Sequence, residues 1–394
     1  MQQNDNAIIK SLLDNDLYKL TMQNAVVSLF PRAKVRYKFI NRGKTEFPDG
    51  FAEQLRKEIS KMSELKLQDD EKNFLKEKCY FLPPTYIDFL AGYKYDPSEV
   101  GVIQTDGDLQ LSIEGYWYRT ILWEVPLMAL ISELYFKMTK AKPNSTDEII
   151  DTVRKKAVKY NMLGINVADF GTRRRYSFEN HDRVVKSLKN YGKPSVMGTS
   201  NVYFAKKYDL LPIGTHAHEW FMFHAAKFGS KMANELSLEN WVKVYNGDLG
   251  IALSDTFTTD AFFRSFNTKF AKLFDGLRHD SGDPIKFAEK TIAHYKLLKI
   301  NSLSKTIVFS DGLNPETVEK ITKYCRGKIG MSFGIGTNFT NDVGVKPLNI
   351  VIKITQAKPE CQNWIPTVKL SDVSGKHTGE KDAIDLVKKV LQIN

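Results

Sequence analysis

Seven short apolar runs recur after about residue 160, and each ends in a small or acidic cluster that a helix-like segment follows. Most of these runs are spaced by roughly 25–40 residues, the length of a β-strand plus a helix. Repeated strand–helix units favour a parallel sheet, either open or closed into a barrel. We therefore expect an α/β fold with strands that end near Asp169, Thr199, Thr215, Asp255, Asp280, Asp311 and Thr337.

The first 140 residues mix helices and strands. Residues 14–30 predict a helix, because apolar residues such as Leu17 and Leu20 recur along it, acidic and amide side chains can cap its start, and Pro31 follows. Residues 35–41 alternate apolar and basic side chains, which is typical of a half-exposed strand. Residues 103–118 have the pattern of a β-hairpin.

The chain has 394 residues, enough for one large domain or two moderate ones, and a net charge of +11. This charge suits a solvated basic surface, a nucleic-acid partner or anionic small substrates. Lysines are scattered along the chain and the only dense basic cluster is Arg173–Arg175, so we expect no nucleic-acid partner.

Membrane attachment is not expected either. No apolar run approaches the roughly 20 residues of a membrane helix, and the first ten residues are polar, unlike a signal peptide. Three widely separated cysteines fit neither a disulfide framework nor a metal site. A reducing cytoplasm is the expected location.

The expected strand ends carry polar groups, and in parallel α/β folds active sites gather at the carboxyl ends of the strands. The segment RHDSGDP places Arg278, Asp280 and Asp283 around a glycine. An arginine can grip an anion with two hydrogen bonds, and the carboxylates can accept ribose hydroxyls or hold the water shell of Mg²⁺. A charged surface turn remains an alternative interpretation.

Two further strand ends have flexible loops. FSDG supplies Asp311 and Gly312, and FGIGT supplies Gly336 and Thr337, where backbone N–H groups can approach a phosphate. The second loop is not a dinucleotide fingerprint, because Phe339 stands where a third glycine is needed. Tight packing turns would give the same pattern.

GTHAHEW contains His216 and His218 at a strand-to-helix junction. Two residues apart, they do not share one helix face, which disfavours a metal pair. One of them can serve as a nucleophile oriented by Glu219 or a distant aspartate, but a structural histidine fits the local sequence equally well.

DFGTRRR offers Phe170 as a stacking surface for a flat ring and three arginines as phosphate ligands. The alternative is a core phenylalanine followed by a solvated helix start. No Walker A motif is present, because Lys38 replaces the glycine required before the GKT at 43–45.

In their order along the chain, DNDLYKLTMQ, DFGTRRR, GTSN, GTHAHEW, LSDT, GLRHDSGDP, VFSDGL, FGIGT and KPLNIVIKI resemble the motifs of nicotinate phosphoribosyltransferases. The resemblance runs from about residue 10 to about residue 375. It implies an irregular seven-stranded α/β barrel at 141–347, and an N-terminal α/β sandwich at 1–140 that residues 348–394 complete. It also implies a homodimer with shared active sites.

The resemblance implies an ATP-dependent ligase that catalyses the first step of NAD salvage from nicotinate. Such an enzyme joins nicotinate to 5-phosphoribosyl-1-pyrophosphate, giving nicotinate mononucleotide and pyrophosphate, and ATP drives the reaction through a phosphohistidine. Mg²⁺ is expected to bind through pyrophosphate and water, without a direct protein ligand.

Carried over by motif, His218 is the expected phosphohistidine, with Asp255 behind it, and Asp280 is the third expected catalytic residue. Tyr18 from the partner subunit and Phe170 would enclose the pyridine ring. The other substrate contacts implied are Thr215 and Arg278 at nicotinate, Arg173, Gly336 and Thr337 at phosphates, Asp280 and Asp311 at ribose, and Ser281, Gly282 and Gly312 in the same loops.

Ser200 bears on the choice of base. Related nicotinamide enzymes have an aspartate at this place in GTSN, which would accept from an amide and repel a carboxylate, so Ser200 favours nicotinate. Nicotinamide remains the first rival. A nucleic-acid-binding protein and a glycosidase that uses Asp280 with Asp283 are two others.

Overall fold

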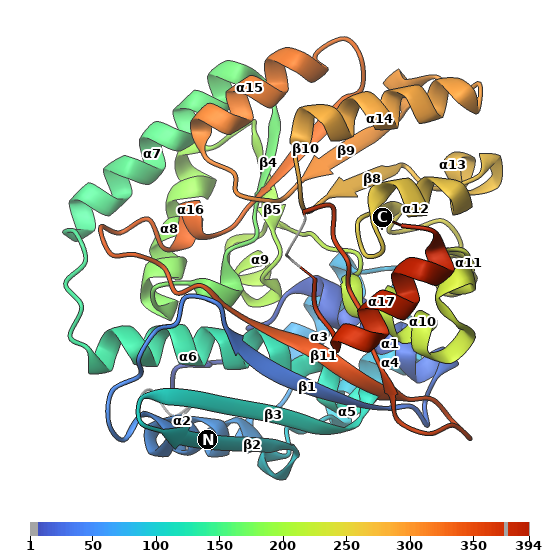
Figure 1. Cartoon of the computed structure of the whole chain (residues 1–394). Coiled ribbons are helices and arrows are strands. Elements are labelled where there is room, and N and C mark those ends of the chain that lie inside the picture. The colour runs from blue at the N-terminus through green and yellow to red at the C-terminus, as the bar shows by residue number, and fades with distance from the viewer. Residues whose placement is uncertain (1–6, 374–376, 394) are drawn as a thin grey trace. The chain divides into compact units, whose positions relative to one another are not determined.

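The computed structural model describes residues 7–373 and 377–393, which contain two sheets and the helices around them (Figure 1). Contacts divide the chain into two compact units. Unit 1 comprises residues up to 24, 36–214 and 335–353, and unit 2 comprises 25–35, 215–334 and 354 onward. The predicted domain limits at 140 and 347 stay a prediction.

The larger sheet has seven strands in the order β6-β5-β4-β10-β9-β8-β7, and the pairs β4–β5, β5–β6, β7–β8, β8–β9 and β9–β10 are parallel. Every one of the seven predicted strand ends lies at or within three residues of an observed one, so the predicted α/β class with seven strands is confirmed. The strands are β4 (Asn166–Asp169), β5 (Val196–Thr199), β6 (Leu211–Pro212), β7 (Ile251–Leu253), β8 (Gly276–His279), β9 (Thr306–Phe309) and β10 (Gly330–Ile335).

Apolar side chains explain why these runs form strands. Leu277, Ile307 and Phe333 are fully buried, and Leu277 of β8 pairs in register with Ile307 of β9. The polar residues come directly after the buried runs, at the carboxyl ends. This order along the chain is what brings several polar loops to one edge of the sheet.

The second sheet has the order β12-β11-β1-β3-β2. The predicted hairpin is present, and its two-residue turn at Asp106 and Gly107 has φ of 45° and 80°, the backbone that a tight hairpin turn requires. Its strands are β1 (Lys34–Asn41), β2 (Val100–Thr105), β3 (Asp108–Tyr116), β11 (Ile350–Lys358) and β12 (Ile365–Pro366).

Side-chain caps define where several helices begin. The Asn314 side chain accepts a hydrogen bond from the Thr317 N–H, and Pro315 takes the first position of helix α15 (Pro315–Cys325). The helices of unit 1 are α1 (Leu17–Leu29, which crosses into unit 2), α2 (Phe51–Lys61), α3 (Asp69–Lys78), α4 (Pro84–Gly92), α5 (Trp117–Thr120), α6 (Glu124–Met138), α7 (Thr146–Leu163), α8 (Phe178–Tyr191), α9 (Val202–Tyr208) and α16 (Thr337–Thr340).

Unit 2 holds the remaining helices, and its C-terminal helix packs against α11. One short 3-10 turn of unit 2 lies at Ser302–Ser304, and those of unit 1 lie at Met62–Glu64, Pro97–Glu99, Ile121–Trp123 and Thr172–Arg174. The helices are α10 (His218–Phe228), α11 (Ser230–Tyr245), α12 (Thr259–Ser265), α13 (Thr268–Leu273), α14 (Pro284–Leu297), α15 (Pro315–Cys325) and α17 (Lys381–Leu391).

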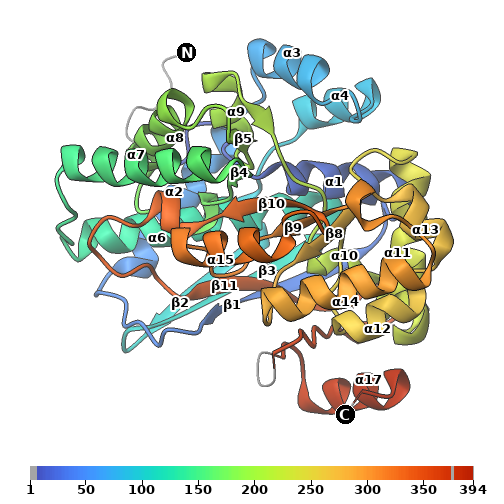
Figure 2. The same cartoon turned by 90° about the horizontal axis from the view of Figure 1, so that it is seen from above.

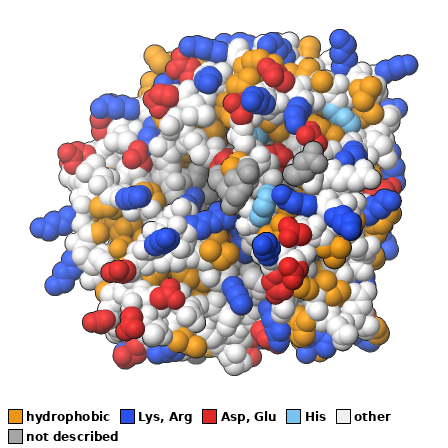
Figure 3. Space-filling view, in the orientation of Figure 1, with side chains coloured by type: hydrophobic (Ala, Val, Ile, Leu, Met, Phe, Trp, Pro, Cys, Tyr) orange, Lys and Arg blue, Asp and Glu red, His pale blue; other side chains and the backbone are white. Residues whose placement is uncertain are grey.

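Basic side chains are dispersed on the surface. Figure 3 shows lysines and arginines spread over the visible face, interspersed with acidic side chains. Among the described residues, no helix is long and apolar enough to cross a membrane.

Candidate active site

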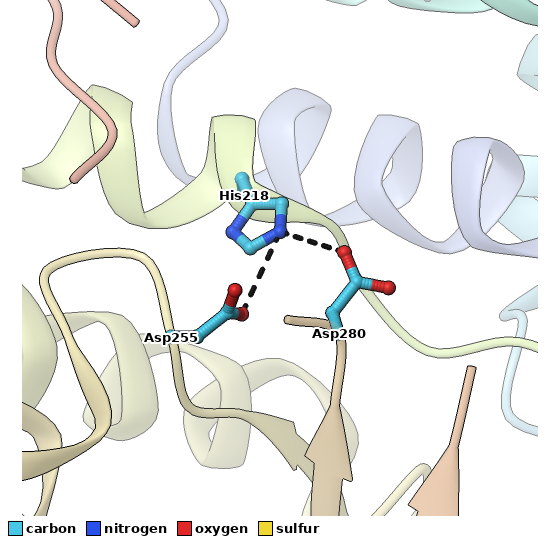
Figure 4. Close-up of side chains that lie close together, drawn as sticks. All are labelled: His218, Asp255 and Asp280. Atoms are coloured by element: carbon cyan, nitrogen blue, oxygen red, sulfur yellow. Dashed lines mark hydrogen bonds and ion pairs between the residues drawn. The ribbon is translucent and has the colours of Figure 1, made fainter. Parts of the chain in front are cut away.

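His218 is the first residue of α10 and is 6% exposed. Its Nε2 lies 3.0 Å from Oδ2 of Asp280 and 3.7 Å from Oδ1 of Asp255 (Figure 4). Its Nδ1 lies 3.0 Å from Oγ1 of Thr256. Asp255 and Asp280 follow the neighbouring strands β7 and β8, so the sheet itself brings the two carboxylates to the imidazole.

Lys369 completes this cluster. Its Nζ lies 2.8 Å from His218 Nε2 and 3.6 Å from Asp255 Oδ2, and its side chain is 12% exposed. The backbone holds it in place, because Lys369 pairs with Thr378 in an antiparallel bridge and the next residue donates its N–H to the Thr256 carbonyl. The cluster thus contains one imidazole, two carboxylates and one ammonium group.

The charges in the cluster are set by burial and proximity. Burial, and then the nearby Lys369 ammonium, lower the pKa of His218 to about 4, although both aspartates oppose this. Burial disfavours ionisation of Asp280, but Arg278, His218 and Lys369 outweigh it and hold its pKa well below the ordinary range. At neutral pH a neutral imidazole therefore faces ionised carboxylates, a state in which a ring nitrogen has a lone pair for nucleophilic attack.

Arg278 holds Asp280 in this position. The Nη2 of Arg278 donates to Asp280 Oδ1 at 2.7 Å, and the Nε of the same guanidinium donates to Ser310 Oγ at 2.8 Å. Ser310 in turn donates to the same Asp280 oxygen at 2.9 Å. The guanidinium is thus fixed by neighbours on two strand ends before any substrate binds.

The loop after Asp280 supports Asp255. The Ser281 hydroxyl donates to Asp255 Oδ2 at 2.6 Å, and Gly282 has a φ of 85°, which favours glycine. Thr215 donates to the Ile251 carbonyl at the start of β7. Asp311 and Gly312 follow β9, beside β8. Of the nine predicted residues of unit 2, Arg278 lies in β8, His218 begins α10, and the other seven lie in loops.

His216 has a different environment. Its ring packs against Phe221 and Trp241, and its Nε2 accepts a hydrogen bond from the Leu253 N–H. Burial lowers its pKa to about 3. These contacts are those of a structural histidine, which leaves His218 as the histidine of the polar cluster.

Asp283, the second carboxylate of the glycosidase alternative, caps α14 by accepting from the N–H groups of Ile285 and Lys286. Its carboxylate is thus used to cap the helix, and Asp283 is not part of the cluster of His218, Asp255 and Asp280.

The six remaining predicted residues lie in unit 1. Tyr18, in the first turn of α1, is 8% exposed, and the residue before it donates its N–H to the Ser200 carbonyl. The Ser200 hydroxyl donates to Oδ1 of buried Asp16 at 2.7 Å. Phe170 donates its N–H to the Ile335 carbonyl, which places Phe170 beside the Gly336 and Thr337 loop.

Arg173 belongs to a cationic group around a single buried carboxylate. Its Nη1 lies 3.5 Å from Glu124 Oε1, and buried Lys19 lies 2.6 Å from Oε2. Burial opposes the ionisation of Glu124, but Lys19, Lys353 and Arg173 lower its pKa to about 2. Arg173 also acts on buried Asp16, where it opposes the rise in pKa that burial causes.

The arginine triplet does not act as one unit. Arg175 is fully buried and donates two hydrogen bonds to Asp14, at 2.7 and 2.8 Å. It is a structural ion pair, whereas Arg173 is partly exposed, so the prediction that all three arginines face either phosphates or solvent is wrong for Arg175.

A metal ion is chemically possible at the histidine cluster. Ligand atoms of His218, Asp255 and Asp280 all lie within 4.8 Å of one another, and Asp255 Oδ1 is buried without a hydrogen-bond partner among the described residues. Mg²⁺ prefers oxygen ligands, which only the carboxylates supply. The Lys369 ammonium already lies beside these groups, and its positive charge opposes the binding of a metal cation directly to them.

Sequence reasoning missed several residues of these clusters. Asp16, Thr256 and Ser310 stand inside motifs that were quoted for their neighbours, so the signal was present. Lys369 is one of 57 basic residues and lies in no motif, and only the fold brings it to His218.

Comparisons with known proteins agree over nearly the whole chain. Residues 165–394 match the profile of the nicotinate phosphoribosyltransferase (NAPRTase) family, and residues 13–132 match the N-terminal domain of that family. The nicotinate phosphoribosyltransferase of Chromohalobacter salexigens is 59% identical over 98% of this chain and 99% of its own, and that of Desulforapulum autotrophicum is 50% identical over 98% and 99%. The crystal structure of the Porphyromonas gingivalis enzyme has a TM-score of 0.96 at 48% identity, covering 98% of this chain and 100% of the other.

Proposed function

This chain belongs to the nicotinate phosphoribosyltransferase family, and from this premise we propose that ATP drives its reaction through phosphorylation of His218. The reaction joins nicotinate to 5-phosphoribosyl-1-pyrophosphate and is the first step of NAD salvage from nicotinate. The observation that carries the ATP-coupled part is the buried, neutral His218 between two carboxylates and Lys369.

In the first step a ring nitrogen of His218 attacks the γ-phosphorus of ATP. The new N–P bond forms while the bond to the leaving oxygen breaks, and ADP departs with that electron pair. The imidazole becomes positive as it attacks, and the ionised Asp280 and Asp255 stabilise this charge. The Lys369 ammonium lies where it can neutralise the phosphoryl oxygens.

In the second step the bond between ribose C1 and pyrophosphate breaks, and the nitrogen of nicotinate forms a new bond to C1. Positive charge develops at the sugar, and carboxylates at the strand ends, Asp280 and Asp311, stabilise it. Pyrophosphate leaves, and hydrolysis of the phosphohistidine returns His218 to its starting state. Mg²⁺, bound through pyrophosphate and water, would neutralise phosphate charge.

The remaining roles are proposals that rest on family membership. Tyr18 and Phe170 enclose the pyridine ring, and Thr215 with Arg278 contact nicotinate. The enzyme is a homodimer with shared active sites, divided into a sandwich at 1–140 with 348–394 and a barrel at 141–347. The remaining substrate contacts are Arg173, Gly336 and Thr337 at phosphates, with Ser281, Gly282 and Gly312 in the adjoining loops.

Ser200 supports nicotinate as the base. A serine hydroxyl carries no charge that would repel the substrate carboxylate. Burial raises the pKa of the neighbouring Asp16 carboxyl, which weakens the repulsion between Asp16 and the substrate carboxylate. Turnover of nicotinamide faster than nicotinate by the purified protein would refute this choice of base.

Incubation with γ-labelled ATP tests the phosphohistidine directly. We expect an acid-labile, base-stable label that maps to the peptide containing His218 and is lost in His218→Ala. The matched variant His216→Gln, two residues away, should keep the label. Labelling that persists in His218→Ala, or ATP stimulation of that variant equal to the wild type, would show that another residue carries the phosphoryl group.

A further inference from the structure

A cavity of about 560 Å³ lies in unit 2, within the size range of small-molecule sites, and His218 is not among its lining residues. Three helices form much of its wall, α12, α14 and α17, and Figure 2 shows α12 and α14 on the same side of the unit as α17. The rest of its wall comes from the loop at Ser281–Asp283, the segment at Leu370–Asp372, and the separate residues Thr258, His377, Gln392 and Ile393.

The helices present basic side chains to this cavity. Lys286 and Lys290 lie one turn apart on α14, Arg264 comes from α12, and Lys388 comes from α17. Among the residues that the structure describes, neither Lys286 nor Lys388 forms an ion pair, although Lys286 lies near enough to Asp283 to help lower the pKa of that carboxyl. These two ammonium groups are therefore available to an anionic ligand.

The acidic residues of the cavity are engaged by protein donors. Asp260 pairs with Lys290 at 2.7 Å, and Asp283 caps α14. Asp372 accepts from both the N–H and the hydroxyl of Thr259. Four basic and three acidic side chains line the cavity, so its net charge is positive, as a site for phosphate groups requires.

A hydrogen bond links a lining residue of the cavity to the histidine cluster. Ser281 lines the cavity and donates to Asp255 Oδ2, while Ser371 donates to the Ser281 hydroxyl at 3.0 Å and the Asp372 N–H donates to it at 3.2 Å. Ser371 has a φ of 67°, which is uncommon for a residue other than glycine and marks a constrained turn. A ligand that moves this turn would change the hydrogen bond that orients Asp255.

We propose that this cavity is a second ligand site, which binds the polyphosphate group of a nucleotide through Lys286 and Lys388 and is coupled to Asp255 through Ser281. Binding by itself does not depend on the phosphohistidine mechanism, whereas the coupling rests on the proposed function. The polyphosphate can come from ATP that also serves as substrate or from a different nucleotide, and both share this chemistry.

Calorimetric titration with inorganic tripolyphosphate tests the binding. The cavity variant, Lys286→Glu with Lys388→Glu, is compared with the control variant, Lys296→Glu with Lys389→Glu, which changes the same charges on the same two helices outside the cavity. We expect one binding event to weaken about tenfold or more in the cavity variant only. Equal titrations of the two variants would overturn the proposal. Lys286→Ala with Lys388→Ala serves as a milder version if the charge reversal unfolds the chain.

Two further measurements test which ligand supplies the polyphosphate and whether the cavity is coupled to Asp255. Binding of ATP to the cavity tighter than tripolyphosphate would show that the nucleoside is recognised, and equal binding would show that only the phosphates are. Tripolyphosphate should change the rate of His218 labelling in the wild type and the control variant, but not in the cavity variant. An equal response in both variants, or no response in the wild type, would refute the coupling. Absence of any label in the wild type would instead refute the phosphohistidine, while the calorimetry would still decide the binding.

Discussion

Replacement of Lys369 by methionine keeps the volume of the side chain and removes the ammonium group 2.8 Å from His218 Nε2. Two unit charges at this distance repel by about 6 kcal/mol if the effective dielectric constant is about 20. That energy would correspond to a pKa change of about 4. It is an upper bound, because water and the adjacent carboxylates screen the pair.

The pKa of His218 itself limits the effect. It is lowered from 6.5 to about 4, burial is the larger cause, and Lys369 is the second. We therefore expect Lys369→Met to raise the pKa of His218 by about 1–2, since burial persists and Asp255 and Asp280 still favour the protonated ring. A histidine protonated near pH 6 has no free lone pair, so phosphorylation should fail below that pH in the variant but continue in the wild type.

The assay is an NMR titration of the His218 ring from pH 4 to 9, with the resonance assigned by its loss in His218→Ala. The rate of labelling by γ-labelled ATP is measured over the same range. Lys389→Met, an exposed lysine change on α17, serves as the control and should leave the titration as in the wild type. A pKa of His218 that is the same in Lys369→Met and in the wild type would refute the electrostatic reasoning.

Three other outcomes follow from the contacts described. Arg278→Ala should remove roughly 2–4 kcal/mol of transition-state stabilisation, the range for an anchoring donor, and kcat/KM should fall accordingly. An unchanged kcat/KM would reject that role. Arg175→Met leaves a buried carboxylate unpaired and should cost roughly 3–5 kcal/mol in urea unfolding, whereas a loss below about 1 kcal/mol would contradict the burial argument. The pKa values of His216, His218 and His224 are lowered from 6.5 to about 3, 4 and 3. Between pH 6.5 and pH 5 these three histidines therefore take up protons in the unfolded chain but not in the folded one. The free energy of unfolding should fall by up to about 6 kcal/mol at pH 5. His224→Gln should make this decline shallower in urea titrations at several pH values, and an unaltered slope would show that His224 does not contribute.

The strands and their polar ends could be predicted because their signal is local. Each apolar run buries its own side chains, and the caps of helices such as α15 lie within a few residues of the helix start. The choice between His216 and His218 needed the ordered motifs, and the structure then gives the physical reason. One ring packs among aromatic side chains and the other faces carboxylates.

The parts that escaped prediction depend on contacts between distant segments. Arg173 and Arg175 are almost adjacent, yet the 3-10 turn at Thr172–Arg174 sends one toward Glu124 and the other into a buried pair with Asp14. Lys369 lies 151 residues after His218, and no spacing rule links them. Such partners become visible only once the backbone path is known.

The route of the chain through its two compact units has a consequence for how the protein is made. The chain passes from one unit to the other after residues 24, 35, 214, 334 and 353, so neither unit is a continuous stretch of sequence. During synthesis, unit 1 lacks a part until residue 353 has left the ribosome, and unit 2 lacks parts until the residues after 354 have followed. Neither unit can therefore finish folding early on the ribosome, and no single cut of the gene yields a fragment that contains one whole unit and nothing of the other.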